Sequence, residues 1–115
     1  MKISIVIPVF NESKTIYKIL KKISSIQKIK KEVIVINDGS TDNTKDIIEK
    51  KCLGLFNKLI SYKQNKGKGY ACRKGLKSAT GKIIIIQDAD LEYDPTDYKK
   101  LIDPILQKKT KVVYG

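Results

Sequence analysis

The sequence predicts an α/β protein: an open, mostly parallel β-sheet with helices on both faces, in three layers. Two observations carry this prediction. β-Branched apolar runs alternate with segments of helical spacing along the whole chain. The runs are also almost continuously apolar, as in parallel strands that helices cover on both sides. With 115 residues, 41% of them hydrophobic, the chain has room for one domain, over residues 1–115.

The first half of the chain predicts two strand–helix pairs. Residues 3–9 are mostly Ile and Val and are expected to form the first strand. Residues 32–36 form the second strand, and Ser40 or Thr41 can cap a short helix that runs to about Lys51. Between the two strands, apolar residues recur at helical spacing while lysines fill the other face: Ile16, Ile19, Leu20, Ile23 and Ile26.

The second half repeats the alternation. Residues 59–62 are a weaker third strand, and a glycine-punctuated turn leads into a helix over about 67–78. The fourth strand is expected over 82–87. A further helix is expected over 94–106, because it opens with Asp-Pro, an N-cap followed by a first-turn proline. A fifth strand is expected over 112–114.

Composition narrows the functional classes. The chain has 24 Lys and Arg against 12 Asp and Glu, a net charge of +12, and no His. The lack of His excludes His-based general bases and triads and most zinc sites. Arg73 is the single arginine, and because base-reading interfaces favour arginine, we expect no nucleic-acid partner. Three explanations of the positive charge remain open: binding to an anionic membrane surface, binding to a polyanionic ligand, or a lysine-rich surface that is simply solvated.

The two cysteines and the N-terminus bear on location. Cys52 and Cys72 are twenty residues apart, without CxxC spacing, and the N-terminal residues do not have the pattern of a signal peptide. We therefore expect reduced thiols and a cytoplasmic protein. No apolar stretch approaches the ~20 residues that a transmembrane helix needs.

An acidic cluster stands out in this basic chain. Asp88 and Asp90 follow an apolar strand as Asp-x-Asp, with Glu92 and Asp94 after them. Such a loop offers the hard oxygen ligands that Mg²⁺ or Mn²⁺ prefers, and solvated turn and cap residues are the competing interpretation. An EF-hand loop does not fit, because Tyr stands at the sixth position instead of Gly and Lys at the twelfth instead of Glu.

Two other polar turns are expected at the same edge of the sheet, where the carboxyl ends of parallel strands meet. One follows the first strand at residues 8–12, and the other follows the second at residues 37–42. Asp38 can accept hydrogen bonds from a base or ribose, although an Asx-type turn is an equal alternative. Residues 65–75 add glycines and four cations that suit a phosphate, but they match neither G-x-G-x-x-G nor a Walker loop.

Together and in this order, these motifs resemble family 2 glycosyltransferases of the Rossmann-like GT-A fold, and among them the dolichol-phosphate mannosyltransferase-like branch. The resemblance spans the chain in five segments: 5–12, 37–42, 65–75, 88–95 and 112–115. It implies a single nucleotide-sugar-binding domain. The donor would be a UDP- or GDP-linked sugar, bound with Mg²⁺ or Mn²⁺.

The resemblance also implies site residues. Those expected to contact the nucleotide are Pro8, Phe10, Glu12, Asp38, Lys68, Arg73 and Asp88. Asp38 would hydrogen-bond the base. Asp88 and Asp90 would bridge the metal to the diphosphate, with Glu92 where a further metal ligand can occur. The catalytic residues are left open.

By the same resemblance, the reaction is an inverting displacement at the sugar carbon, with a polyprenyl phosphate as one possible acceptor. Because the sequence ends where the family's acceptor-binding half would begin, we expect a donor-binding half that is a fragment or works with a partner subunit or second copy. A lipid acceptor would place it at the cytoplasmic face of a membrane. The rival interpretations are a non-catalytic nucleotide-sugar-binding module, an Asp-x-Asp phosphatase with Asp88 as nucleophile, and a lysine-driven nucleic-acid binder.

Overall fold

The computed structural model describes residues 2–26, 29–89 and 112–114, the last as backbone only. Its five strands form one sheet in the order β3-β2-β1-β4-β5, and all four pairings are parallel. The strands are β1 Lys2–Val9, β2 Lys30–Asp38, β3 Lys58–Tyr62, β4 Ile83–Ile86 and β5 Val112–Tyr114. The helices are α1 Ile16–Ser24, α2 Thr44–Lys51 and α3 Lys68–Ser78.

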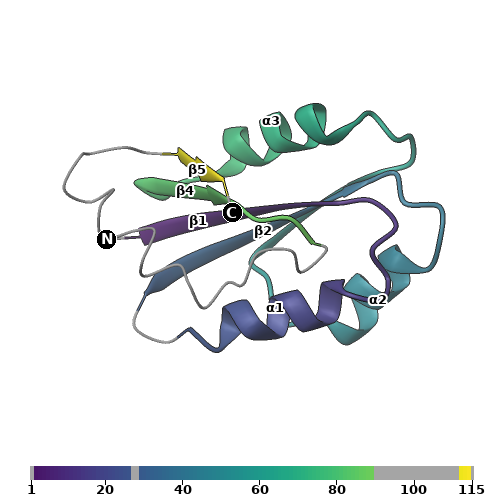
Figure 1. The fold of residues 1–115 in the computed structure, drawn as a ribbon, viewed down its shortest axis with the longest axis horizontal. Helices are drawn as coiled ribbons and strands as arrows, with labels where there is room; N and C mark the ends of the chain where they lie inside the picture. The colour runs from purple at the N-terminus through teal and green to yellow at the C-terminus, as the bar shows by residue number, and fades with distance from the viewer. Residues whose placement is uncertain (1, 27–28, 90–111, 115) are drawn as a thin grey trace.

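The three predicted layers are confirmed, with α1 and α2 on one face of the sheet and α3 on the other (Figure 1). Side chains alternate along β1, so Ile5 and Ile7 pack in the core under α1 and α2 whereas Val6 packs in the core under α3. The hydrophobic core on each face of the sheet holds one free cysteine, Cys52 on the α1–α2 side and Cys72 on the α3 side. Burial raises the pKa of both thiols, which keeps them protonated.

Helix α3 packs closely against the sheet at Gly75. A Cβ atom at this position would lie 2.3 Å from Val6 Cγ1 and 2.9 Å from Ile36 Cδ1. The glycine therefore lets the helix backbone rest directly on β1 and β2. This close contact sets how near the second half of α3 lies to the two strands.

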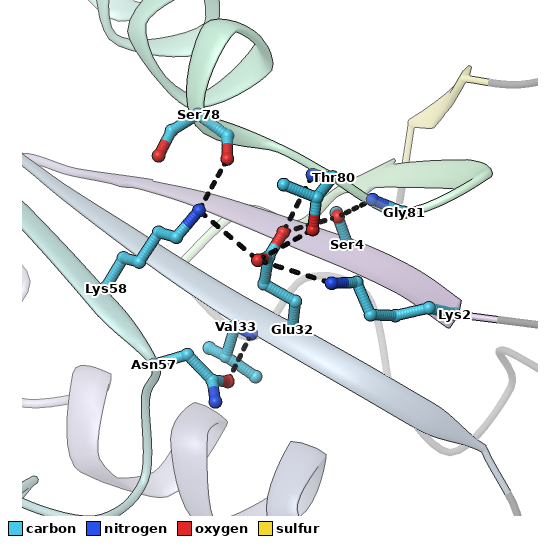
Figure 2. Close-up of polar contacts among 9 residues, drawn as sticks. All are labelled: Lys2, Ser4, Glu32, Val33, Asn57, Lys58, Ser78, Thr80 and Gly81. Atoms are coloured by element: carbon cyan, nitrogen blue, oxygen red, sulfur yellow. Dashed lines mark hydrogen bonds and ion pairs between the residues drawn. The ribbon is translucent and has the colours of Figure 1, made fainter.

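A buried carboxylate ties the amino ends of the strands together (Figure 2). Glu32, only 7% exposed, accepts hydrogen bonds from Ser4 Oγ at 2.8 Å and from the backbone N–H and hydroxyl of Thr80 at 2.9 and 3.0 Å. The ammonium groups of Lys58 and Lys2 lie 3.3 and 3.7 Å from the same carboxylate. Burial alone would raise the pKa of Glu32, but these hydrogen bonds outweigh it and lower the pKa to about 2.

The predicted cap of α2 is wrong. The helix begins at Thr44, and its N-cap position is Asn43 instead of Ser40 or Thr41. The backbone N–H and hydroxyl of Thr44 donate to the carboxylate of Asp42, the N–H at 2.9 Å. The predicted helix over 94–106 lies outside the described residues.

The strand order explains where a ligand can bind. β1 lies between β2 and β4. The chain adds β2 and β3 on one side of β1 within the sheet, and then adds β4 and β5 on the other side. In open α/β sheets, the crevice at such a switch point, at the carboxyl ends of the strands, is the usual ligand site. The turns after β1, β2 and β4 all lie there.

Candidate functional site

A pocket of about 450 Å³ opens at the carboxyl ends of β1, β2 and β4, beside the start of α3. This volume lies within the usual range for small-molecule sites. Its lining residues are Pro8, Val9, Phe10, Glu12, Asp38, Asn65, Gly67, Lys68, Asp88 and Ala89. Segments far apart in the sequence therefore meet at the switch point of the sheet.

The turn after β1 presents an aromatic ring to this pocket. Phe10 is 42% exposed, although it directly follows a buried strand. Asn11 holds the turn in place: its backbone N–H donates to Ser40 Oγ at 3.1 Å, and its Oδ1 accepts from the Thr41 N–H at 2.8 Å. Asn11 has a φ of +53°, a left-handed conformation that Asn tolerates better than most residues. Ser40 and Thr41 thus join the turns after β1 and β2 instead of capping α2.

Asp38, at the end of β2, holds the wall of the pocket that leads into α3. Its carboxylate is buried and accepts from the backbone amides of Lys66 at 2.9 Å and Gly67 at 3.0 Å. The side-chain amide of Asn65 donates both to this carboxylate and to the Asp38 carbonyl, each at 3.0 Å. Gly39 follows with a φ of +65°, and a Cβ there would lie 2.3 Å from the Asn65 nitrogen. Only glycine therefore fits where these two turns cross.

Thr15 joins the base of the first turn to the loop after β4. Its hydroxyl contacts Glu12 Oε2 at 3.1 Å and donates to the carbonyl oxygen of Ala89. The backbone N–H groups of Thr15 and Ile16 also donate to the Glu12 carbonyl, at 3.2 and 3.0 Å. Glu12 and the loop that carries Asp88 are thus held by one side chain at the entrance of α1.

Asp88 and Lys68 line the pocket and contact each other directly. The Lys68 ammonium forms an ion pair and hydrogen bond with Asp88 Oδ1. The Lys68 side chain is 58% exposed and that of Asp88 is 33% exposed, so solvent reaches both. The carboxylate of Asp88 therefore binds a cationic group, the ammonium of Lys68, at this wall of the pocket.

This donor set fits a Mg²⁺ or Mn²⁺ ion. Such ions are held by one or two protein carboxylates and complete their coordination with water and ligand phosphate. Asp88 supplies hard oxygens inside the pocket, whereas the other predicted ligands, Asp90 and Glu92, lie outside the described residues. Among the residues described, no three His, Cys, Asp or Glu side chains cluster, so the described part supplies the ligand set only in part.

The pocket brings together six of the seven residues predicted to contact a nucleotide: Pro8, Phe10, Glu12, Asp38, Lys68 and Asp88. The seventh, Arg73, is exposed on α3 outside the lining, with its guanidinium near Gly69 in the first turn of that helix. Sequence reasoning did not single out Thr15 or the individual role of Asn65. Asn65 lies in the 65–75 segment, which the sequence marked as a candidate part of the site. No feature of the sequence around Thr15 indicated a role in the site.

The fold and the site define an α/β protein with a ligand-sized pocket at the switch point of its sheet. The model of glycosyl transferase family 2 matches residues 4–115. The chain is 36% identical to the dolichyl-phosphate beta-glucosyltransferase of Saccharomyces cerevisiae, over 94% of this chain and 35% of that protein. It therefore belongs to glycosyl transferase family 2, as the sequence predicted. It spans half or less of the length of the curated relatives it matches.

Two solved structures agree with this assignment. S. aureus TarS 1–349 in complex with UDP-GlcNAc is 29% identical, with a TM-score of 0.76 over 93% of this chain and 32% of that one. The mannosyltransferase PcManGT from Pyrobaculum calidifontis, in complex with GDP-Man and Mn²⁺, is 29% identical, with a TM-score of 0.68 over 76% of this chain and 27% of that one. The predicted GT-A fold is thus confirmed, and divalent metal occurs with a donor in the family.

Proposed function

We propose that this chain forms the donor-binding half of a glycosyltransferase and holds a nucleoside-diphosphate sugar in the pocket at the switch point. The observation that carries the proposal is the meeting of Phe10, Asp38, Lys68 and Asp88, which come from four separate segments, around one cavity. The exposed ring of Phe10 and the buried carboxylate of Asp38 suit a base. The ammonium of Lys68 suits the diphosphate, and the carboxylate of Asp88 suits the divalent counter-ion of that diphosphate. The resemblance to complexes with UDP-GlcNAc and GDP-Man supports the same ligand class.

Each part of the donor has a counterpart in the pocket. The base would stack against Phe10 and Pro8, since an exposed aromatic ring offers a flat apolar contact. Asp38 would accept a hydrogen bond from a base N–H with the acceptor capacity that its turn leaves free. Lys68 and Asp88 lie at the start of α3 and after β4, where the diphosphate would be held.

The proposed reaction is an inverting transfer of the sugar to a polyprenyl phosphate. A bound Mg²⁺ or Mn²⁺, held by Asp88 with Asp90 and Glu92, would stabilise charge on the leaving diphosphate. The lining residues would hold the base and the diphosphate of the donor in place. Because a phosphate oxygen is already anionic, this acceptor requires no protein base, whereas a hydroxyl acceptor would require one. The name of the yeast relative supports a lipid-phosphate acceptor.

The positive charge of one long segment of the chain supports peripheral contact with an anionic membrane. Residues 50–87 contain no acid but ten cations: Lys50, Lys51, Lys58, Lys63, Lys66, Lys68, Arg73, Lys74, Lys77 and Lys82. The ammonium groups of Lys66 and Lys74 lie 5.6 and 5.4 Å from the centre of the Tyr70 ring. Within the part of the chain that the structure describes, no helix is long and apolar enough to span a membrane. Binding to anionic but not neutral vesicles, lost at high salt, would support this contact.

The decisive experiment is calorimetric titration with UDP and with GDP, in Mn²⁺ and in EDTA. We expect one nucleotide to bind in the micromolar range with Mn²⁺ and at least tenfold more weakly with EDTA. Asp90→Asn should remove most of this gain while the far-UV circular dichroism stays unchanged. Equal affinities in Mn²⁺ and EDTA would contradict the metal role, and no binding of either nucleotide would contradict the proposed site. Transfer of radiolabelled sugar to a polyprenyl phosphate then tests the reaction itself.

A further inference from the structure

Lys68 already binds one oxygen of the carboxylate that a metal would need. Its ammonium lies against Asp88 Oδ1, and both side chains line the pocket. A divalent ion and an ammonium at the same carboxylate repel each other, so an ion that binds Asp88 through Oδ1 displaces the ammonium from this position. We propose that Lys68 and the divalent cation compete for Asp88, and that the ammonium moves to the donor diphosphate when the cation binds. This inference rests on the proposed function.

The geometry makes the exchange inexpensive. Lys68 is the first residue of α3, and its side chain is 58% exposed on a flexible four-carbon stem. Gly67 precedes it with a φ of +95°, in a turn that Asp38 holds through the Gly67 N–H. The backbone of Lys68 is therefore anchored, while its ammonium can swing within the pocket. Exposed ion pairs of this kind are weak, so a divalent cation can displace it readily.

The displaced ammonium remains beside the place where a diphosphate would bind. Lys68 then changes from a competitor of the metal into a counter-ion of the nucleotide. Before donor binding, the pair neutralises Asp88 in the pocket. Afterwards, the metal takes Asp88 and the lysine takes a phosphate oxygen. The exchange couples the binding of the cation to that of the nucleotide. The cation frees Lys68 for the diphosphate, and the diphosphate draws Lys68 away from Asp88. Such coupling is reciprocal.

This exchange predicts opposite effects for one substitution. Lys68→Met keeps an unbranched apolar stem but removes the charge. The affinity for Mn²⁺ alone, measured from free Mn²⁺ by electron paramagnetic resonance, should rise about two- to fivefold as the competing ion pair is lost. The affinity for UDP or GDP in saturating Mn²⁺ should instead fall about tenfold, because the nucleotide loses a charged contact.

The matched control is Lys77→Met, which removes the same charge from the last turn of α3, away from the pocket lining. It should leave both affinities within about twofold of wild type. Lys68→Met without a gain in Mn²⁺ affinity, or with a gain no larger than that of Lys77→Met, would overturn the competition for Asp88. A gain in Mn²⁺ affinity with unchanged nucleotide affinity would overturn the movement to the diphosphate. If wild-type protein binds neither nucleotide, the proposed function fails, while the Mn²⁺ measurement still decides the competition.

Discussion

The carboxylate of Asp38 accepts a hydrogen bond from the backbone N–H of Gly67 at 3.0 Å, which joins the end of β2 to the start of α3. Lys66 N–H and the Asn65 amide donate to the same group, so both of its oxygens accept hydrogen bonds. A carboxylate has about four acceptor positions, and three donors occupy it here. Asp38 therefore shapes the pocket wall. Burial and this nearby carboxylate also raise the pKa of Tyr62, so Tyr62 stays neutral at physiological pH.

Asp38→Asn should weaken the fold as well as nucleotide binding. An Asn side chain turns an NH₂ group toward backbone N–H donors that now face an oxygen. We expect the free energy of unfolding, from urea denaturation, to fall by about 1–3 kcal/mol. Asp46→Asn, an exposed acid on α2, should cost clearly less. An unchanged free energy of unfolding would show that the turn at 65–67 does not depend on this carboxylate.

Glu32 should make the stability of the protein sensitive to acid. Its pKa of about 2 in the folded protein lies below the ordinary value of 4.5, so its contribution is full above pH 4.5 and is lost as the pH falls toward 2. The difference corresponds to about 3 kcal/mol. Glu32→Gln should lower the free energy of unfolding at pH 7 and flatten its decline between pH 4.5 and 2. Glu49→Gln, an exposed acid on α2, should keep the wild-type slope. Parallel pH profiles for wild type and Glu32→Gln would contradict this prediction.

Local signals explain why the architecture could be predicted. The apolar runs of β1 and β4 and the helical spacing of α1 are each encoded within about ten residues, and parallel pairing follows from their alternation. The start of α2 depended on a distant contact instead. Asn11, some thirty residues earlier, binds Ser40 and Thr41 and removes them from capping. Within the 40–51 segment, the contact of Asp42 with Thr44 marks the observed start, but Ser40 and Thr41 are residue types that cap equally well.

The residues of the candidate site also fall into two groups, those that could be predicted from the sequence and those that depend on distant contacts. Residues at strand ends, such as Asp38 and Asp88, could be predicted because parallel topology brings strand ends together. Side chains that act through long-range contacts could not. Thr15 contacts Ala89 from 74 residues away, and Glu32 receives its hydrogen bonds from Thr80 across 48 residues. Each reads locally as an ordinary helix-start or strand residue.

Thr15→Val should loosen the loop that carries Asp88. Valine has nearly the same shape as threonine, but it lacks the hydroxyl that contacts Glu12 and Ala89. We expect the gain in nucleotide affinity from Mn²⁺ to fall several-fold, with a loss of about 1 kcal/mol in the free energy of unfolding. Thr15→Ser keeps the hydroxyl and should restore the Mn²⁺ gain. The same calorimetric titrations measure both variants, and a serine variant as weak as the valine variant would count against the hydroxyl.

Two glycines of α3 should respond to alanine in opposite ways. At Gly75 the new Cβ would lie 2.3 Å from Val6 Cγ1, and neither Val6 nor Ile36 can yield easily because both are fully buried. Such overpacking usually costs about 1–3 kcal/mol. At Gly69, in the first turn of the same helix, the nearest atom to a new Cβ is Arg73 Nη1 at 3.6 Å, an ordinary contact.

Urea denaturation followed by circular dichroism should therefore show Gly75→Ala less stable than wild type by about 1–3 kcal/mol. Gly69→Ala should be unchanged or more stable by up to ~1 kcal/mol, since alanine favours the helix over glycine. The pair shares one helix and one chemical change, so propensity acts in the same direction at both positions. A difference in sign can then come only from the contact of Gly75 with the sheet, and equal effects would mean that α3 does not rest on β1 and β2 at that residue.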